Sequence, residues 1–579
     1  MTSQKINYVE YLREVIVVLG SRKKFIPLLC LGFIITACLD LFGVTIVGPF
    51  IGMFLAPEEF TERFEVLRGI DFKVIMIGAS ALLVFIFISR AIVGYLVQNF
   101  ILKIAFERQA ELRKDLTTAY LRGEYTHRLK KNSADYNRTI ITFCDNYIEV
   151  LVGMLRISAD LLTLLGLACL LIYTNFLLFL VCLIMVMGFF AIYSSIYANK
   201  FIKLGVIKNK GIHDFSQALN EGIKGLKEIK VLNVVKFFED RVHQGAKNAA
   251  DANKTLWLFN IVPRYFIELL LVIIVAAIIT IAVIFEYETV AVVSSLGIFL
   301  VASLKILPSV NAIVASFNAI NIGRDAVHHL HGDLILMEGI DIPDELVHSG
   351  NKLSGSDIFT LKLQDINFKY PETENNVLNN LNMTISQGEF IGISGRSGEG
   401  KTTLIDLILG IHRPTSGLIT FNDHNIYEDL GNWRQNIAYL PQETFLLEAT
   451  IKENVALGIK NDNLDDSKIM LALEKAGLLK FIEELPEGIN SNIGEGGLFI
   501  SGGQKQRISL ARAFFQEKNI FIFDESTSNL DADSEQRVME TIFGLVGQKN
   551  TLIMISHKPS ILERCTTNYI LENGELAEK

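Results

Sequence analysis

The stretch Gly395-Arg-Ser-Gly-Glu-Gly-Lys-Thr402 decides the fold of the C-terminal part of the chain. It follows the short apolar run Glu389–Ser394 and precedes the run Leu404–Ile411, which has the composition of a helix. A strand, a GxxxxGK[ST] loop and a helix in this order are typical of a phosphate-binding loop. Its glycines let backbone N–H groups surround phosphate oxygens, while Lys401 reaches the terminal phosphates and the Thr402 hydroxyl helps to hold Mg²⁺.

A chance glycine-rich turn is the alternative, and further features of the same region exclude it. An apolar strand, Asn519–Phe523, ends in Asp524 and Glu525. This arrangement suits one carboxylate on the Mg²⁺ side and a second that polarises the attacking water. The remaining features are Gln442 after Pro441, the run Ile500–Arg507, and His557 after the apolar strand Thr551–Ser556.

The chain has 579 residues, too many for one ordinary domain, and half of them are hydrophobic. The formal net charge is −9, and no basic block is present, which argues against nucleic acid as a partner. A spanning helix needs about 20 mostly apolar residues. The stretches that meet this requirement are Phe25–Leu55, Phe72–Leu102, Tyr147–Tyr173, Phe176–Tyr197, Tyr265–Phe285 and Val290–Phe317.

Cations are distributed unevenly between the loops. The long polar segments Lys103–Arg138 and Lys200–Lys254 are rich in Lys and Arg, whereas the other connections are poor in them. The positive-inside rule therefore predicts that both termini and both long loops are cytoplasmic. We expect the spans beside these loops to continue past the bilayer as polar helices. The segment Ala56–Asp71 is expected to be either a short amphipathic piece on the outer surface or an unstructured loop.

These observations predict a multidomain chain: an all-α six-helix transmembrane domain over residues 1–320, a polar linker over 321–356, and an α/β P-loop ATPase domain over 357–579. The order of the motifs resembles the ATPase domain of the ABC transporter family. Together with the spans, it resembles an exporter-type half transporter over nearly the whole chain. The resemblance implies ATP and Mg²⁺ as cofactors and a bacterial inner membrane location, with the ATPase domain in the cytoplasm.

The resemblance also implies roles for individual residues. It implies that the catalytic residues are Glu525, His557 and Gln442, and that Thr402, Gln442 and Asp524 form the Mg²⁺ site. For ATP, it implies that adenine stacks on Tyr370 and that the phosphate loop includes Gly395, Ser397, Gly398, Gly400, Lys401, Thr402 and Thr403. The implied signature motif is Ser501, Gly502, Gly503 and Gln504. The family's signature usually begins with Leu, where this chain has Ile500, and its D-loop usually has Ala, where this chain has Asn529. Neither change removes a catalytic group.

In the family, ATP lies between the phosphate loop of one ATPase domain and the signature motif of another. One chain supplies one of each, so it cannot close a site alone. Because Glu525, His557 and Ser501 are all present, two copies could build two competent sites. The resemblance therefore favours a homodimer over an asymmetric pair.

Cations within the spans are the candidate substrate ligands, since ionisable residues at membrane depth are functional candidates by default. At 1.5 Å per residue, Arg90, Lys305 and Arg264 lie about 24–32 Å from the outer helix ends. Snorkelling to the inner headgroups is the alternative. Glu268, four residues after Arg264, could neutralise it.

Three local segments are similar to the bacterial lipid-linked oligosaccharide flippase branch of the family: Val262–Glu268, Leu304–Ser309 and Ser89–Ala91. This similarity implies an amphiphilic substrate, a lipid-linked oligosaccharide with a pyrophosphate headgroup, flipped or exported across the bilayer. Export of another lipid, a drug or a peptide is the alternative. An ATP-gated regulator that does not pump is a further one, and the intact Glu525 argues against it.

Overall fold

The computed structural model describes residues 8–55, 71–123, 125, 133–174, 176–285, 289–338, 359–371, 373–459, 464–524, 532–545 and 550–579. The chain divides into two compact units. The helical unit comprises Met1–Gly123 and Lys131–Ile342, and the nucleotide unit comprises Glu124–Lys130 and Pro343–Lys579. The expected outer segment Ala56–Asp71 lies outside the described residues, except for Asp71.

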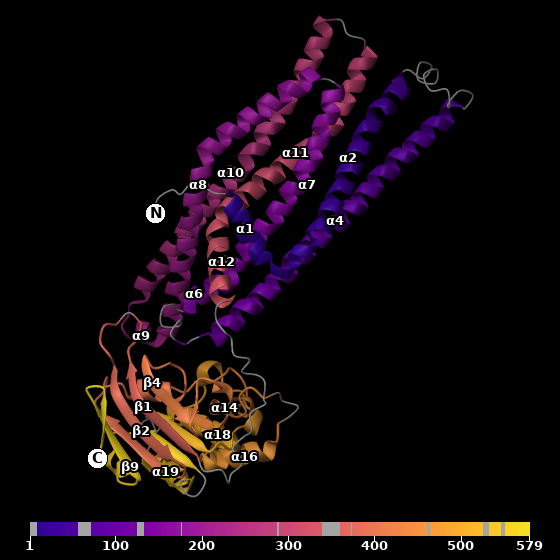
Figure 1. The fold of residues 1–579 in the computed structure, drawn as a ribbon. Coiled ribbons are helices and arrows are strands. Elements are labelled where there is room, and N and C mark those ends of the chain that lie inside the picture. The colour runs from indigo at the N-terminus through magenta and orange to yellow at the C-terminus, as the bar shows by residue number, and fades with distance from the viewer. Residues whose placement is uncertain are drawn as a thin grey trace. The chain divides into compact units, whose positions relative to one another are not determined.

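Long helices run side by side through the helical unit (Figure 1). They are α2 (Ile26–Leu55), α4 (Phe72–Arg122), α7 (Cys144–Thr174), α8 (Phe176–Lys224), α10 (Val235–Ile284) and α11 (Thr289–Ile322). Within the described residues, 5 helices are long and apolar enough to cross a membrane. The shorter helices are α1 (Tyr8–Leu19), η1 (Gly20–Phe25), α6 (Ser133–Asn137), η3 (Arg138–Phe143), α9 (Leu226–Val231) and α12 (Arg324–Glu338).

Three helices are much longer than a bilayer requires. α4 has 51 residues, α8 has 49 and α10 has 50, so each is about 75 Å long at 1.5 Å per residue. The polar halves of α8 and α10 pack closely because glycines face each other's backbones. A Cβ on Gly211 would lie 2.7 Å from the Ala249 nitrogen, and one on Gly245 would lie 2.6 Å from the Phe215 nitrogen. The prediction that spans continue as polar helices is confirmed.

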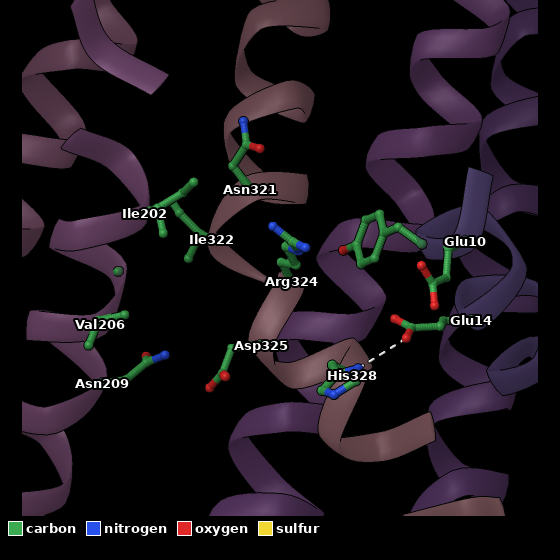
Figure 2. Close-up of a pocket in the computed structure, with 12 residues that line it drawn as sticks. Glu10, Glu14, Ile202, Val206, Asn209, Asn321, Ile322, Arg324, Asp325 and His328 are labelled. Atoms are coloured by element: carbon green, nitrogen blue, oxygen red, sulfur yellow. Dashed lines mark hydrogen bonds and ion pairs between the residues drawn. The ribbon is translucent and has the colours of Figure 1, made fainter. Parts of the chain in front are cut away.

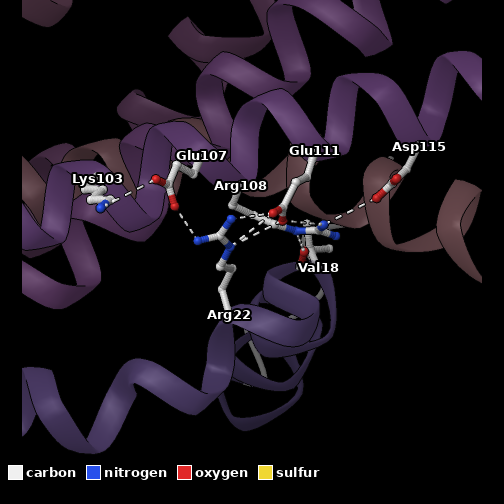
Figure 3. A network of polar contacts seen from close by, with 7 residues as sticks. All are labelled: Val18, Arg22, Lys103, Glu107, Arg108, Glu111 and Asp115. Carbon is white, nitrogen blue, oxygen red and sulfur yellow. Dashed lines mark hydrogen bonds and ion pairs between the residues drawn. The ribbon is translucent and has the colours of Figure 1, made fainter.

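The N-terminal helices are fixed to α4 by a charged network (Figure 3). The Arg22 guanidinium of η1 forms ion pairs with Glu107 and Glu111. Arg108 Nε donates to the Val18 carbonyl oxygen at 2.8 Å. Arg108 is 8% exposed, so this contact satisfies a buried donor and holds the end of α1 against α4.

The stretch predicted as a linker begins with a helix. α12 packs against α1, and its residues Ala326, Val327 and Leu330 belong to the same buried cluster as Tyr11 and Val15 of α1. The apolar positions recur at helical spacing within a polar composition, and this pattern gives α12 its buried face. The rest of the predicted linker, residues 339–358, lies outside the described residues.

The nucleotide unit is built on two sheets (Figure 1). One sheet has the order β2-β1-β4-β5 and the other has the order β10-β9-β3-β8-β7-β6. In the second sheet, β9, β3, β8, β7 and β6 are parallel and β10 is an antiparallel edge strand. The strands are β1 (Thr360–Phe368), β2 (Leu378–Ser386), β3 (Phe390–Gly395), β4 (Ser416–Phe421), β5 (His424–Asn425), β6 (Ile437–Leu440), β7 (Ile520–Asp524), β8 (Thr551–Ile555), β9 (Thr567–Glu572) and β10 (Glu575–Glu578).

Two hydrophobic clusters organise this unit. The first contains Ile391 and Ile393 of β3, Leu404 of α13 and residues of β1 and β2, so it fills the space beside the phosphate-loop helix. The second contains Ile508 and Phe514 of α18 together with residues of α15 and α16. The helices of the unit are α13 (Lys401–Ile408), α14 (Leu430–Gln435), α15 (Ile451–Val455), α16 (Asp466–Lys475), α17 (Leu479–Glu483), α18 (Gly502–Phe515), α19 (Ala532–Leu545) and α20 (Pro559–Leu562), with 3-10 turns η5 (Gly488–Asn490) and η6 (Glu495–Gly497).

Candidate functional site

The phosphate loop joins β3 to α13, and its conformation depends on glycine. Gly398 has φ +88° and Gly400 has φ +99°, both in the region that favours glycine. A Cβ on Gly395 would lie only 2.4 Å from the Leu571 carbonyl oxygen of the neighbouring strand. The loop can therefore curl tightly over the end of the sheet, and Ser397 lies within this curl. This confirms the strand–loop–helix prediction.

Lys401 is buried at the start of α13, and backbone groups hold its charge. Its Nζ donates to the Gly395 carbonyl oxygen at 2.9 Å and to the Arg396 carbonyl oxygen at 2.8 Å. Among the described residues, no carboxylate forms an ion pair with it. Within the described part of the chain, no countercharge therefore offsets the ammonium group inside the loop, where a polyphosphate would bind.

Asp524, predicted as a Mg²⁺ ligand, and the predicted catalytic residues His557 and Gln442 lie at or just after the ends of neighbouring strands. Asp524 ends β7 and is 3% exposed, with Ile555 of β8 as its cross-strand neighbour. His557 follows β8, and Gln442 follows β6, which pairs with β7. Because carboxyl ends of parallel strands meet at one edge, the structure brings these side chains to the edge where the phosphate loop begins.

A second carboxylate lies close to Asp524. Asp406 projects from α13, and burial, followed by the charge of Asp524, raises its pKa to about 6. Asp406 Oδ2 also lies 3.9 Å from Nε2 of the buried His412. Sequence reasoning did not identify Asp406, although its position within the phosphate-loop helix was a usable signal. Two neighbouring carboxylates favour a cation between or beside them, consistent with Mg²⁺ on the Asp524 side.

Tyr370 lies beside the phosphate-loop helix, as its predicted role requires. Its hydroxyl is 3.0 Å from Thr403 Oγ1, and its ring makes edge contacts with Phe368 and His412. Thr402 is the exposed neighbour of Thr403 on α13. The stacking of adenine on Tyr370 stays a prediction.

The signature residues lie at the start of α18. Ser501 is the N-cap of this helix and forms a capping box with Gln504, in which each side chain accepts from the other residue's backbone N–H. Ser501 and Gly502 are exposed, and Gly503 is partly exposed. α18 packs in the hydrophobic cluster that contains Ile508 and Phe514. The phosphate loop lies between β3 and α13, which pack in the cluster that contains Ile391 and Leu404. Glu525 and the predicted D-loop lie outside the described residues.

The candidate substrate cations of the helical unit have carboxylate partners. Arg90 Nε lies 2.8 Å from Asp40 Oδ1, and Lys305 Nζ lies 2.7 Å from the same oxygen. Asp40 is 5% exposed. Arg264 pairs instead with Glu268 on its own helix, with Nε 2.9 Å from Oε1, and it is 65% exposed. The structure thus brings Arg90 and Lys305 together, on a carboxylate that sequence reasoning did not assign to them.

A phosphate-binding loop follows β3 at the carboxyl edge of a parallel sheet, and Asp524 lies at the same edge at the end of β7, with β8 between the two strands. This arrangement defines the nucleotide unit as a P-loop ATPase domain. Residues 378–528 match the protein family described as ABC transporter. This part of the nucleotide unit is therefore similar to the ATPase domain of ABC transporters.

Known proteins resemble both units. The chain is 29% identical over 389 residues to an ATP-dependent lipid A-core flippase of Alkalilimnicola ehrlichii, a match that covers 66% of this chain and 64% of that protein. A protein with the same description from Coxiella burnetii is 39% identical over 220 residues, which are 38% of this chain and 37% of that protein. The matches thus span less than two thirds of these relatives.

A solved structure covers more of the chain. The structure of a bacterial Atm1-family ABC exporter with ATP bound aligns with a TM-score of 0.76 at 20% identity, covering 95% of this chain and 94% of that chain. The fold is therefore that of an ABC exporter, as the sequence predicted.

Proposed function

We propose that this chain is a half transporter that uses ATP hydrolysis to move an amphiphilic substrate across the membrane in which its helices lie. The observation that carries the proposal is the position of Lys401 and Asp524 at one sheet edge, in a chain with 5 membrane-length helices among its described residues. ATP would bind the loop through its phosphates, and Mg²⁺ would sit between those phosphates, Thr402 and Asp524.

The working form in this proposal is a homodimer. Ser501 and its neighbours cap an exposed helix start, which suits an anion supplied from outside the unit. The helix α13, which follows the phosphate loop, packs in the other cluster of the same unit. A second copy would place its Ser501 against the nucleotide held by Lys401. We expect chains with Ser501→Arg and Lys401→Ala to be inactive alone and to regain turnover only when co-assembled, because the mixed dimer has one intact site.

The substrate in this proposal is a lipid with an anionic headgroup, and the finer candidate is a lipid-linked oligosaccharide with a pyrophosphate. Two cations, Arg90 and Lys305, share the carboxylate of Asp40, so these three side chains together carry one net positive charge. A desolvated anion needs such a partner at membrane depth. Arg264 is offset by Glu268 and would contribute less. The relatives described as lipid A-core flippases also support an amphiphilic substrate.

The test is translocation in liposomes that contain the purified chain. The panel consists of a polyprenyl-pyrophosphate oligosaccharide, the corresponding monophosphate, an uncharged glycolipid and a cationic dye. We expect the pyrophosphate lipid to be moved fastest and the cationic dye not to be moved. Lys305→Gln is the informative variant, because it removes the net charge while Arg90 still pairs with Asp40. Lys103→Gln, an exposed cation on α4, is the matched control. Equal transport of the whole panel would contradict the anionic-headgroup assignment.

A further inference from the structure

Arg512 is a partly buried arginine of the nucleotide unit, and none of the carboxylates that the structure describes pairs with it. Burial lowers the pKa of its guanidinium. The cavity of about 580 Å³ in the helical unit is different, because side chains of both signs line it and Glu14 there pairs with His328 (Figure 2). Since a buried charge must be paired or hydrogen-bonded, backbone groups have to hold Arg512.

All three nitrogens of the Arg512 guanidinium donate to backbone carbonyl oxygens. Nε donates to the Asn454 carbonyl oxygen at 2.9 Å, and both terminal nitrogens donate to the Phe445 carbonyl oxygen at 3.1 Å. Asn454 is fully buried, and its side chain accepts from the Leu447 N–H at 2.8 Å and donates to the Leu447 carbonyl oxygen at 3.1 Å. Arg512 and Asn454 together therefore fasten the chain at Phe445 and Leu447.

The fastened chain is the segment that carries Gln442. It runs from Pro441 to Ala449, between β6 and α15, and it contains no helix or strand. Gln442 lies three residues before Phe445. No regular ladder of backbone hydrogen bonds fixes such a segment, so side chains that reach its backbone determine its conformation.

The helix that carries Arg512 is a firm anchor for this segment. Ser501 caps the start of α18 through its capping box with Gln504, and Arg512 lies in the last turn. The eleven residues between the two ends correspond to about 16 Å at 1.5 Å per residue. Ile508 and Phe514 pack the helix into its hydrophobic cluster, so its last turn is held firmly against the rest of the unit.

We propose that Arg512 is a positioning residue, which places Gln442 beside the Mg²⁺ and ATP held by the phosphate loop. It acts through the Phe445 carbonyl oxygen and not through contact with the nucleotide. The inference rests on the proposed function, in which this chain hydrolyses ATP and Gln442 contacts Mg²⁺.

The geometry of this contact requires a guanidinium. Its planar fork presents Nε to one carbonyl oxygen and the two terminal nitrogens to the other at the same time. A lysine ammonium keeps the charge, but one nitrogen on a flexible stem cannot hold two carbonyl oxygens in the same fixed geometry. Arg512→Lys should therefore loosen Phe445 while it keeps a cation at this position.

The experiment measures ATP turnover by the purified full chain as a function of Mg²⁺ concentration, and binding of a fluorescent ATP analogue with Mg²⁺ and in EDTA. The variants are Arg512→Lys, Arg512→Gln, Gln442→Ala and the double variant of Arg512→Lys with Gln442→Ala. Arg434→Lys is the matched control. Arg434 of α14 also donates to two backbone carbonyl oxygens, but these belong to Leu409 and Gly410, after α13.

We expect Arg512→Lys to lower turnover about tenfold and to raise the Mg²⁺ concentration at half-maximal turnover about threefold, with binding in EDTA unchanged. In the Gln442→Ala background, Arg512→Lys should have little further effect, because the side chain that it positions is gone. The same comparison is made from Mg²⁺-dependent binding of the analogue, which does not require turnover. Arg434→Lys should leave the Mg²⁺ dependence unchanged.

Thermal unfolding identifies the folded variants, and Arg512→Gln repeats the test with a neutral side chain. Wild-type turnover and Mg²⁺ dependence in a folded Arg512 variant would overturn the proposal. Equal losses from Arg512→Lys with and without Gln442 would also overturn it, because Arg512 would then only stabilise the fold. Failure of the wild type to hydrolyse ATP would instead contradict the proposed function itself.

Discussion

Two lysines, the buried Lys401 of the nucleotide unit and the partly buried Lys305 of the helical unit, have opposite surroundings. Lys401 of the nucleotide unit is held by the carbonyl oxygens of Gly395 and Arg396, which leave its charge uncompensated. Lys305 of the helical unit lies 2.7 Å from Asp40 Oδ1, a carboxylate that Arg90 also contacts. Lys401, which is placed for a phosphate ligand, is held by carbonyl dipoles. Lys305, which also joins helices, is held by a carboxylate countercharge.

The largest effect is expected from removing the uncompensated charge. Lys401→Gln should lower ATP turnover about 100-fold or more, because Lys401 is buried at the start of α13, whereas Arg396, the other cation of the loop, is exposed. Thermal stability should change little, since the carbonyl partners sit at the loop surface of the site. Turnover of Lys401→Gln at close to the wild-type rate would contradict the proposal that the charge of Lys401 is placed for the phosphates of ATP. The measurement is steady-state phosphate release by the purified chain.

Removing the shared countercharge tests the other side of the comparison. Asp40→Asn leaves Arg90 and Lys305 close together without their carboxylate, which should cost about 3 kcal/mol of stability. Lys305→Gln should cost much less, because Asp40 keeps Arg90 as a partner. The two variants are compared by thermal unfolding in one detergent. Equal stability of Asp40→Asn and the wild type would show that the cluster does not hold the helices together.

A smaller effect is expected at the exposed pair of α10. Arg264 is 65% exposed and paired within its own helix, so Arg264→Gln should change stability by less than about 0.5 kcal/mol. If the anionic headgroup contacts Arg90 and Lys305, transport per folded molecule should fall less in Arg264→Gln than in Lys305→Gln. A larger loss of transport in Arg264→Gln than in Lys305→Gln would indicate that the headgroup binds at α10 instead.

The smallest effect concerns pH and Asp406. Its folded pKa is about 6, raised above its usual 3.8, so folding favours the protonated carboxyl. The ionised Asp406 therefore lowers the free energy of unfolding. This loss of stability is absent below the unfolded pKa, grows as the pH rises from the unfolded to the folded pKa, and stays constant at higher pH. Asp406→Asn should therefore raise the unfolding temperature of the nucleotide unit at pH 7.5 but not at pH 4.

The buried Trp433 reports on unfolding of this unit, with the exposed Trp257 replaced by Phe. A stabilisation of equal size at both pH values would show that Asp406 acts through packing and not through its charge. Asp365→Asn, an exposed carboxylate of β1, is the control.

The two units also differ in how far the sequence predicts them. The phosphate loop could be identified because its chemistry depends on neighbouring residues, Gly395 to Thr402, whose spacing fixes the backbone locally. The Asp40 cluster depends on three helices, and Asp40 and Arg90 are 50 positions apart. No local pattern links such residues. Counting from the outer helix ends would have placed Asp40 at about the same depth as both cations.

The predicted linker shows a second limit. Its polar composition concealed the buried face of α12, which α1, η3 and α7 cover. The Asp40 cluster and the buried face of α12 both depend on residues that are distant in the sequence, and sequence reasoning therefore did not predict either of them.

The most direct test of the account measures ATP hydrolysis and translocation of a polyprenyl-pyrophosphate oligosaccharide on the same liposomes, for the wild type and for Glu525→Gln. The amide of this variant cannot polarise water as a carboxylate does, so ATP should still bind while turnover nearly stops. The account predicts that translocation stops with it. Translocation that continued at the wild-type rate without hydrolysis would identify an ATP-gated pathway and contradict the proposal of an ATP-driven pump.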